Sequence, residues 1–251
     1  MGSKDRLYAD IMAVHPEVTG SCNLVIVKQP DNSTVKFVVD CGLFQERQYS
    51  KNNESLPFIP ANIDFCLVTH NHVDHVGRLP FMVNKGFAKE IYMTETTAKL
   101  LPLALEDSHK VLRDVAKRQN HSPLYSEADV SQTMRLIHPC KYNETIQIRP
   151  NIKATFFMNG HLMGASSILV QISWEGYETI NLFFSGDYSN KNMFFDVPDL
   201  PDWVLELPLT VVQESTYGDM DSYEVTSCFK QNVLKCLEHG GTVVAPVFSL
   251  G

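Results

Sequence analysis

The chain has 251 residues, of which 44% are hydrophobic and 20% charged, as is typical of a folded globular protein and not of a disordered or collagen-like one. Its 21 basic and 29 acidic residues give a net charge of −8, without the basic excess that most nucleic-acid-binding proteins carry. The sequence contains neither the roughly 18 consecutive apolar residues of a transmembrane helix nor, at its N-terminus, the apolar stretch of a signal peptide. We therefore expect a cytoplasmic α/β protein of one large domain, or of one domain and the start of another.

Apolar runs bounded by turn residues predict strands in the first hundred residues. Residues 24–27 and 35–39 flank Gln29-Pro30-Asp31-Asn32-Ser33, a pattern typical of a β-hairpin. The next apolar run predicts a strand at residues 65–69. A short helix at 77–83 and a strand at 90–93 are expected to follow it.

Helical spacing predicts a long helix from residue 94 to about residue 119. Six apolar residues recur on one side of it: Leu100, Leu103, Leu105, Val111, Leu112 and Val115. Pro102 is expected in the first turns of this helix or at a break in it. A second helix is predicted from Ser126, its N-cap, to about residue 137.

The second half of the chain again has the pattern of strands. These are predicted at 145–148, 154–158, 168–172, 180–184 and 211–213, followed by a helix at 223–237 and a strand at 242–247. Runs of strands followed by helices, twice over, indicate two sheets packed face to face with helices outside. The chain stops directly after its last predicted strand, so we expect a fragment or one piece of a split protein. Its six cysteines are scattered without a CxxC pair, which favours buried free thiols in a reducing compartment.

The strongest chemical signal follows the predicted strand at 65–69. Four potential metal ligands fall within six residues there: His70, His72, Asp74 and His75. Where a strand ends, His70 and His72 share one side, and the residues after them turn onward towards a second site. This arrangement suits two divalent ions roughly 3.5–4 Å apart. The alternative is a solvated loop that is merely rich in histidine.

Two ions need more ligands than this loop supplies. A histidine and an aspartate that follow other predicted strands can provide them. His161 lies in the turn Asn159-Gly160-His161, and Asp187 lies in Ser185-Gly186-Asp187, each after a predicted strand. A carboxylate such as Asp187 can place one oxygen towards each ion and so bridge them. Asp40, which ends the apolar run 37–39, is a candidate to orient ligands by hydrogen bonding. Taken singly, His161 and Asp187 would be ordinary turn residues.

Together these residues resemble the successive motifs of the metallo-β-lactamase superfamily. Two further segments, Asp40-Cys41-Gly42-Leu43-Phe44-Gln45 and Glu214-Ser215-Thr216-Tyr217-Gly218-Asp219, are similar to motifs of its β-CASP branch of nucleic-acid-processing nucleases. Gly77-Arg78-Leu79-Pro80 is placed as in ribonucleases of that branch, and residues 106–108 and 124–129 resemble its cleavage-and-polyadenylation-type members. The resemblance extends from about residue 12 to residue 251.

The resemblance implies a four-layer αββα sandwich at residues 1–218 and the incomplete beginning of a β-CASP domain at 219–251. It implies that His70, His72 and His161 hold one Zn²⁺. Asp74 and His75 would hold a second Zn²⁺, and Asp187 would bridge the two ions. In the family, a bridging hydroxide attacks the scissile phosphate, and Glu214 supports a histidine that protonates the leaving oxygen. Asp74, Glu214 and Asp40 are thereby the expected catalytic residues.

The chain departs from the family after Glu214, because it ends at the expected first strand and turn of the β-CASP domain. Later histidines complete the second site and supply the acid in the family, so here we expect a weak second zinc site and incomplete activity. The leading hypothesis is a ribonuclease, with DNA open as a substrate, no membrane partner, and a homodimer or a missing C-terminal half as alternatives. A thioester or lactone hydrolase, and a non-catalytic metal-binding subunit that needs a partner chain, stay open as well.

Overall fold

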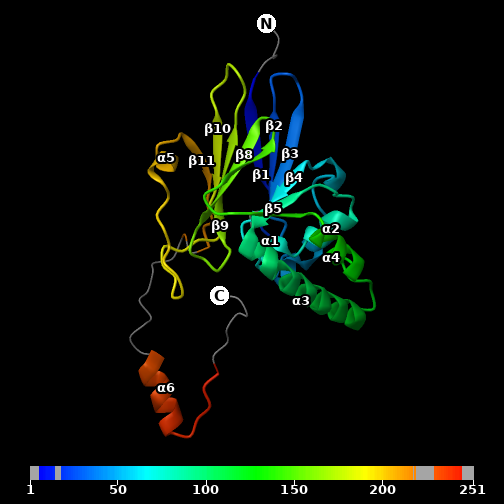
Figure 1. Cartoon of the computed structure of the whole chain (residues 1–251). Helices are drawn as coiled ribbons and strands as arrows, with labels where there is room; N and C mark the ends of the chain where they lie inside the picture. The colour runs from blue at the N-terminus through cyan, green and yellow to red at the C-terminus, as the bar shows by residue number, and fades with distance from the viewer. Residues whose placement is uncertain (1–5, 15–17, 217, 219–228, 245–251) are drawn as a thin grey trace. The chain divides into compact units, whose positions relative to one another are not determined.

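The structure is a computed structural model that describes residues 6–14, 18–216, 218 and 229–244. It divides the chain into two compact units, residues 1–214 and 215–251. The first unit contains both β-sheets (Figure 1). In the second unit the described residues form one helix, α6 (Phe229–Glu238). The predicted β-CASP beginning at 219–251 stays a prediction.

The first sheet has six strands in chain order: β1 (Tyr8–Ala13), β2 (Asn23–Lys28), β3 (Thr34–Val39), β4 (Phe65–Leu67), β5 (Ile91–Thr94) and β6 (Ile137–Cys140). β1, β2 and β3 pair antiparallel, whereas β3, β4, β5 and β6 run parallel. The predicted hairpin joins β2 to β3, where the Gln29 N–H donates to the Ser33 carbonyl at 3.1 Å. Because β3 and β4 are parallel, the residues that follow them emerge at the same edge of the sheet.

The second sheet has five strands in the order β11-β10-β9-β8-β7. They are β7 (Thr145–Arg149), β8 (Ile152–Met158), β9 (Ser166–Ile172), β10 (Ile180–Phe184) and β11 (Leu209–Val212). β7 to β10 pair antiparallel, and β11 joins β10 in parallel. β8 and β10 therefore end on the same side of the sheet.

The two sheets pack face to face around a shared apolar core. Alternate residues of β2 and β3 enter that core, and Phe37 stacks on Phe65 with ring centroids 4.6 Å apart. Phe156, Ile168 and Leu182 from the second sheet meet them, each almost completely buried. The other residues of β2 and β3, such as Leu24 and Val38, pack instead into the core beneath the helices. The central strands of the first sheet are thus buried on both faces, as an inner layer requires.

Helices cover the outer face of the first sheet (Figure 1). They are α1 (Val73–Val76), α2 (Leu79–Asn84), α3 (Glu95–Gln119) and α4 (Glu127–Met134). Thr94 caps α3 by accepting from the Thr97 N–H, and Ser126 opens α4 with a capping box, as its sequence predicts. On the second sheet the outer layer is thin, with α5 (Asp202–Leu205) burying Val204 against Phe157 and Leu169. The predicted αββα sandwich is confirmed.

Several sequence predictions need correction. β1 and β6 were not predicted, and Ile137 begins β6 and does not end the second helix. Pro102 lies within α3 without breaking it, but Leu103, Val111 and Val115 on the predicted apolar side are exposed. Residues 242–244 form no strand, and 245–247 lie outside the described residues, as do 223–228 of the helix predicted there.

The described cysteines are all free thiols, and four of them are buried: Cys22, Cys41, Cys66 and Cys140. Cys236 is half-buried, and Cys228 lies outside the described residues. Within the part of the chain that the structure describes, we find no helix that is both long enough and apolar enough to span a membrane.

Candidate metal centre

The sequence-predicted ligands converge because they follow strands that end on the same side of the sandwich. His70 comes three residues after β4, His161 three residues after β8, and Asp187 three residues after β10. The two sheets meet directly here, where the Ser166 N–H and its hydroxyl both donate to the Thr69 carbonyl, at 2.9 and 3.0 Å. The backbone before His70 is thereby fixed to the sheet that carries His161 and Asp187.

Four side chains form a group with metal-ligand geometry: His70, His72, His161 and Asp187. One ligand atom from each lies within 4.8 Å of all the others. His72 Nδ1 is 3.2 Å from His70 Nε2 and 3.1 Å from His161 Nε2. Ligand atoms at the usual distance from a tetrahedral zinc are about 3.3 Å apart. The spacing of the three ring nitrogens therefore fits a single ion held among them.

The protonation of His70 supports this interpretation. The Thr69 hydroxyl donates to Asp40 Oδ2 at 2.8 Å, which leaves its lone pair free to accept from His70 Nδ1 at 3.0 Å. His70 Nδ1 then carries the ring proton, and Nε2 points into the group as a bare lone pair. Burial, and then the nearby rings of His75, His72 and His161, lower the pKa of His70 well below its ordinary value. A buried neutral imidazole is the form that binds a metal.

Asp187 faces two directions with its two carboxylate oxygens. Oδ2 lies 3.8 Å from His70 Nε2 and 3.7 Å from His161 Nε2, whereas Oδ1 lies 3.2 Å from His75 Nε2. The Asn159 side-chain amide fixes this segment by donating to the Asp187 carbonyl at 2.8 Å. The carboxylate is therefore placed between the group of four and His75, the orientation that a bridging ligand requires.

Asp40 supports the site from beneath and is almost completely buried. Its carboxylate accepts from the Thr69 N–H, from the Thr69 hydroxyl and from His75 Nδ1, each at 2.8 Å. The bond from His75 Nδ1 leaves Nε2 directed at Asp187. Asp40 has a φ of 63°, a left-handed conformation that Asp and Asn adopt more readily than other non-glycine residues. Asp40 touches a predicted ligand and not the group of four itself, so its geometry is that of a positioning residue.

The electrostatics of the site change between His70 and His75. Burial lowers the pKa of His75, but the carboxylates of Asp40 and Asp187 outweigh it and raise that pKa well above the ordinary value. Burial also raises the pKa of Asp74, and the charge on Asp187 adds to this effect. The two carboxylates on either side of His75 thus favour the protonated form of its ring.

The remaining predicted site residues lie outside the group of four. Asp74, in the first turn of α1, and His75 form no ligand group of their own among the described residues. Glu214 ends the first unit, where its carboxylate accepts from the Tyr188 N–H at 3.0 Å. The second zinc site and the catalytic roles of Asp74 and Glu214 stay predictions.

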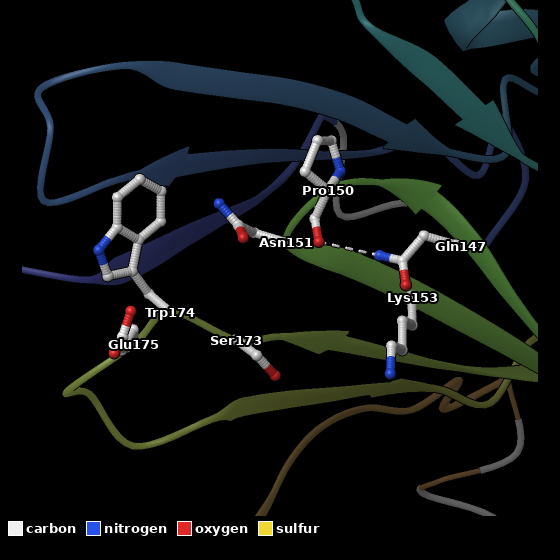
Figure 2. A pocket seen from close by; sticks show the side chains of 7 residues that line it. All are labelled: Gln147, Pro150, Asn151, Lys153, Ser173, Trp174 and Glu175. Atoms are coloured by element: carbon white, nitrogen blue, oxygen red, sulfur yellow. Dashed lines mark hydrogen bonds between the residues drawn. The ribbon is translucent and has the colours of Figure 1, made fainter.

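A separate pocket of about 460 Å³ lies at the opposite end of the second sheet (Figure 2). It is lined from the β7–β8 turn by residues such as Gln147 and Asn151, and from the β9–β10 turn by Trp174. The Gln147 amide donates to the Pro150 carbonyl at 3.1 Å on its wall. None of the predicted metal ligands lines this pocket, so it is distinct from the metal centre.

Comparison with known proteins places the chain in a family. The model of a family described as the metallo-beta-lactamase superfamily matches residues 18–143, which include Asp40 and the histidine cluster. The chain belongs to the metallo-β-lactamase superfamily. The fold and the resemblance predicted from the motifs are therefore confirmed.

Members of the superfamily with curated names match nearly the whole chain. Ribonuclease TTHA0252 of Thermus thermophilus is 32% identical over 239 residues, which cover 93% of this chain and 50% of that protein. Endoribonuclease ysh1 of Aspergillus fumigatus is 28% identical, covering 94% of this chain and 26% of that protein. Transcription termination factor FttA of Methanosarcina mazei is 29% identical, covering 94% of this chain and 36% of that protein. The chain thus spans half the length of the first relative and about a third or less of the other two.

Two residues of this metallo-β-lactamase site were not predicted from the sequence. Thr69 links Asp40, His70 and the second sheet, and its position directly before the histidine cluster was the available signal. Gly42 lies so close to the metal loop that an added Cβ would stand 1.5 Å from the Asp74 carbonyl oxygen. Its place in the segment 40–45 gave no hint of that contact.

Proposed function

We propose that this chain is the metal-binding part of a metal-dependent phosphodiester hydrolase that acts on RNA in the cytoplasm. The observation that carries the proposal is the group of His70, His72, His161 and Asp187 at the edge between the two sheets. The names of the relatives, two of them ribonucleases, support RNA as the substrate class. The free, mostly buried cysteines agree with a reducing compartment.

The donor set fits zinc, since three imidazoles and a carboxylate are ligands that Zn²⁺ accepts readily. His70, His72 and His161 would hold the first ion, with His75, Asp74 and Asp187 facing the second. Divalent ions in such a site offset charge on phosphoryl oxygens and make water a stronger nucleophile near neutral pH.

The chain's own residues prepare the site for this chemistry. Asp40 and Thr69 set the ring protons on the Nδ1 atoms of His75 and His70, so that both Nε2 atoms face the site. Burial raises the pKa of Asp74, so its carboxylate is more stable beside a metal ion than without one. Asp74 would therefore act in the hydrolysis as a residue of the second metal site.

The test measures metal content per chain together with cleavage of a labelled single-stranded RNA by the 251-residue protein. We expect tight binding of one zinc, weaker binding of a second, and loss of the first in His161→Ala. His138→Ala is the matched control, because His138 is exposed on β6 and lies outside the metal group.

The outcomes separate the hypotheses. RNA cleavage that needs bound metal would support the nuclease. Cleavage of DNA but not of RNA would identify DNA as the substrate instead. Hydrolysis of a thioester or lactone by a protein that leaves RNA uncleaved would favour the small-molecule hydrolase. Metal binding with no hydrolysis, recovered when the matching C-terminal part is supplied, would identify the chain as one part of the nuclease.

A further inference from the structure

The turn that follows Asp187 exposes an unusual set of apolar side chains. Met193 is 92% exposed, Phe194 75% and Tyr188 46%. Of the phenylalanines whose side chains the structure describes, Phe194 is the only one that is exposed. Single exposed apolar residues are ordinary on protein surfaces. Met193 and Phe194, however, are adjacent and are held next to a predicted metal centre, so their exposure needs a physical explanation.

Hydrogen bonds fix this turn to the segment that carries His161. The Ser189 N–H donates to the Asn159 carbonyl, and the Asn192 side-chain amide donates to the Gly160 carbonyl, both at 2.9 Å. The Phe194 N–H in turn donates to the Asn192 side-chain oxygen at 2.9 Å. The exposed pair therefore keeps a defined position relative to the metal-ligand segment.

The backbone at Gly160 shows how closely the two segments approach. Gly160 has a φ of 77°, and an added Cβ would lie 2.2 Å from the Ser189 carbonyl oxygen. At the start of the same turn, Tyr188 directly follows Asp187, and its hydroxyl accepts from the Gln213 amide at 2.7 Å. The turn thus begins next to one predicted metal ligand and packs against the residues that precede another.

We propose that Met193 and Phe194 form a stacking platform that holds the bases of single-stranded RNA beside the metal centre. This inference rests on the proposed function. Aromatic faces stack on nucleobases without regard to sequence, and in single-strand-binding proteins they are combined with cations that contact the phosphates. Lys191 is exposed in the same turn and supplies such a cation.

The charge of the chain favours stacking as the source of affinity. With a net charge of −8, this chain as a whole does not attract a polyanion. Stacking depends little on charge, so it provides affinity on an acidic protein. It also places the backbone near the metal ligands, because the platform is tied to the residues that precede His161.

The test is equilibrium binding of a fluorescein-labelled oligouridylate to the chain as purified, at 4 °C, with the RNA checked for intact length afterwards. We expect Phe194→Ala to weaken binding roughly 5- to 150-fold, the effect of losing one base–aromatic stack. Phe194→Trp is expected to retain the affinity. Tyr177→Ala is the control, since Tyr177 is an exposed aromatic residue in the turn before β10, at the other end of that strand.

Salt dependence separates stacking from charge. The ratio of the two dissociation constants, Phe194→Ala over wild type, should be the same at every salt concentration. Lys191→Ala should instead reduce the slope of log affinity against log salt by about 0.7, the value for one phosphate contact on a single strand. A Phe194→Ala effect that disappears at high salt would overturn the stacking proposal.

The remaining outcomes distinguish this inference from the proposed function. If wild type binds no single-stranded RNA, RNA as the substrate class fails and the platform fails with it. If wild type binds and both Phe194→Ala and Met193→Ala bind equally well, the platform alone is refuted. Unchanged binding with an altered oligomeric state in Phe194→Ala would also refute it, in favour of a contact between copies of the chain.

Discussion

Asp40→Asn tests how the site is positioned, because it removes a charge while keeping the shape of the side chain. Asparagine also accepts the left-handed backbone that Asp40 adopts, so the substitution adds little strain. The Asn oxygen can still accept from the Thr69 N–H. Its amide nitrogen, however, would face His75 Nδ1, which now donates to Asp40 at 2.8 Å. His75 is then expected to lose its proton from Nδ1 and to keep the one on Nε2, the atom that should face a metal.

The size of the effect follows from the bonds that are lost. A hydrogen bond to a charged group contributes about 1.5–3 kcal/mol, and His75 loses one such bond to a buried carboxylate. That range corresponds to roughly 10- to 100-fold weaker metal binding, as is common when a residue that orients a ligand is changed. The loss should fall on the ion that His75 faces. The ion among His70, His72 and His161 should be affected less.

The assay is calorimetric titration of the metal-stripped protein with Zn²⁺, which resolves the two affinities. Asp31→Asn is the control, because Asp31 lies in the exposed β2–β3 turn, where its carboxylate accepts from the Ser33 N–H of the same turn. Thermal unfolding of the metal-free variants should show that both fold. Equal weakening of both ions, or no weakening of either, would refute the positioning role of Asp40.

Four further predictions concern packing and proton linkage. Gly42→Ala should displace the metal loop and lower the zinc content, because its Cβ would stand 1.5 Å from the Asp74 carbonyl oxygen. In the control, Gly176→Ala, the Cβ meets nothing within 4 Å and the φ of 82° adds only local backbone strain, so the zinc content should not change. Phe65→Ala should lower the free energy of unfolding in urea by about 3–5 kcal/mol, since the ring is buried between the sheets; a loss below about 1 kcal/mol would contradict this. Binding of the second metal at pH 7 should release about one proton in calorimetry with buffers of different ionisation enthalpy, because the metal replaces the proton on His75. The raised pKa of His75 also stabilises the metal-free fold below about pH 6.5, and that contribution should be lost as pH rises through the folded-state pKa.

Local patterns were sufficient to predict most elements of the fold. The turn at 29–33 and the cap at Ser126 depend on neighbouring residues, and each lies where it was expected. β6 was missed because it contains Pro139, which removes a backbone donor and is tolerated there only at the edge of a sheet. The apolar side of α3 was misjudged because its buried face follows Leu101, Leu105 and Ala116. Leu103, Val111 and Val115 lie away from that face and are exposed.

The group of four could be predicted because each ligand directly follows a strand, so that sequence position indicates place in the fold. Contacts between distant segments could not be predicted in the same way. Thr69 bonds to a carboxylate 29 residues earlier, and the close approach of Gly42 to Asp74 depends on the path of two loops. Neither contact has a periodicity or a spacing that a single sequence reveals.

The origin of the ligands on both sheets has a consequence for folding. His70 follows the first sheet, whereas His161 and Asp187 follow the second, so a bound ion joins segments about a hundred residues apart. Such an ion acts as a reversible cross-link across a long loop. For a covalent link that closes a loop of about 100 residues, the loss of chain entropy in the unfolded state is worth about 4.7 kcal/mol in the simplest model. Removing the ion with a chelator should therefore loosen the contact between the two sheets first. Faster hydrogen exchange at Thr69 and Ser166 should report this loosening.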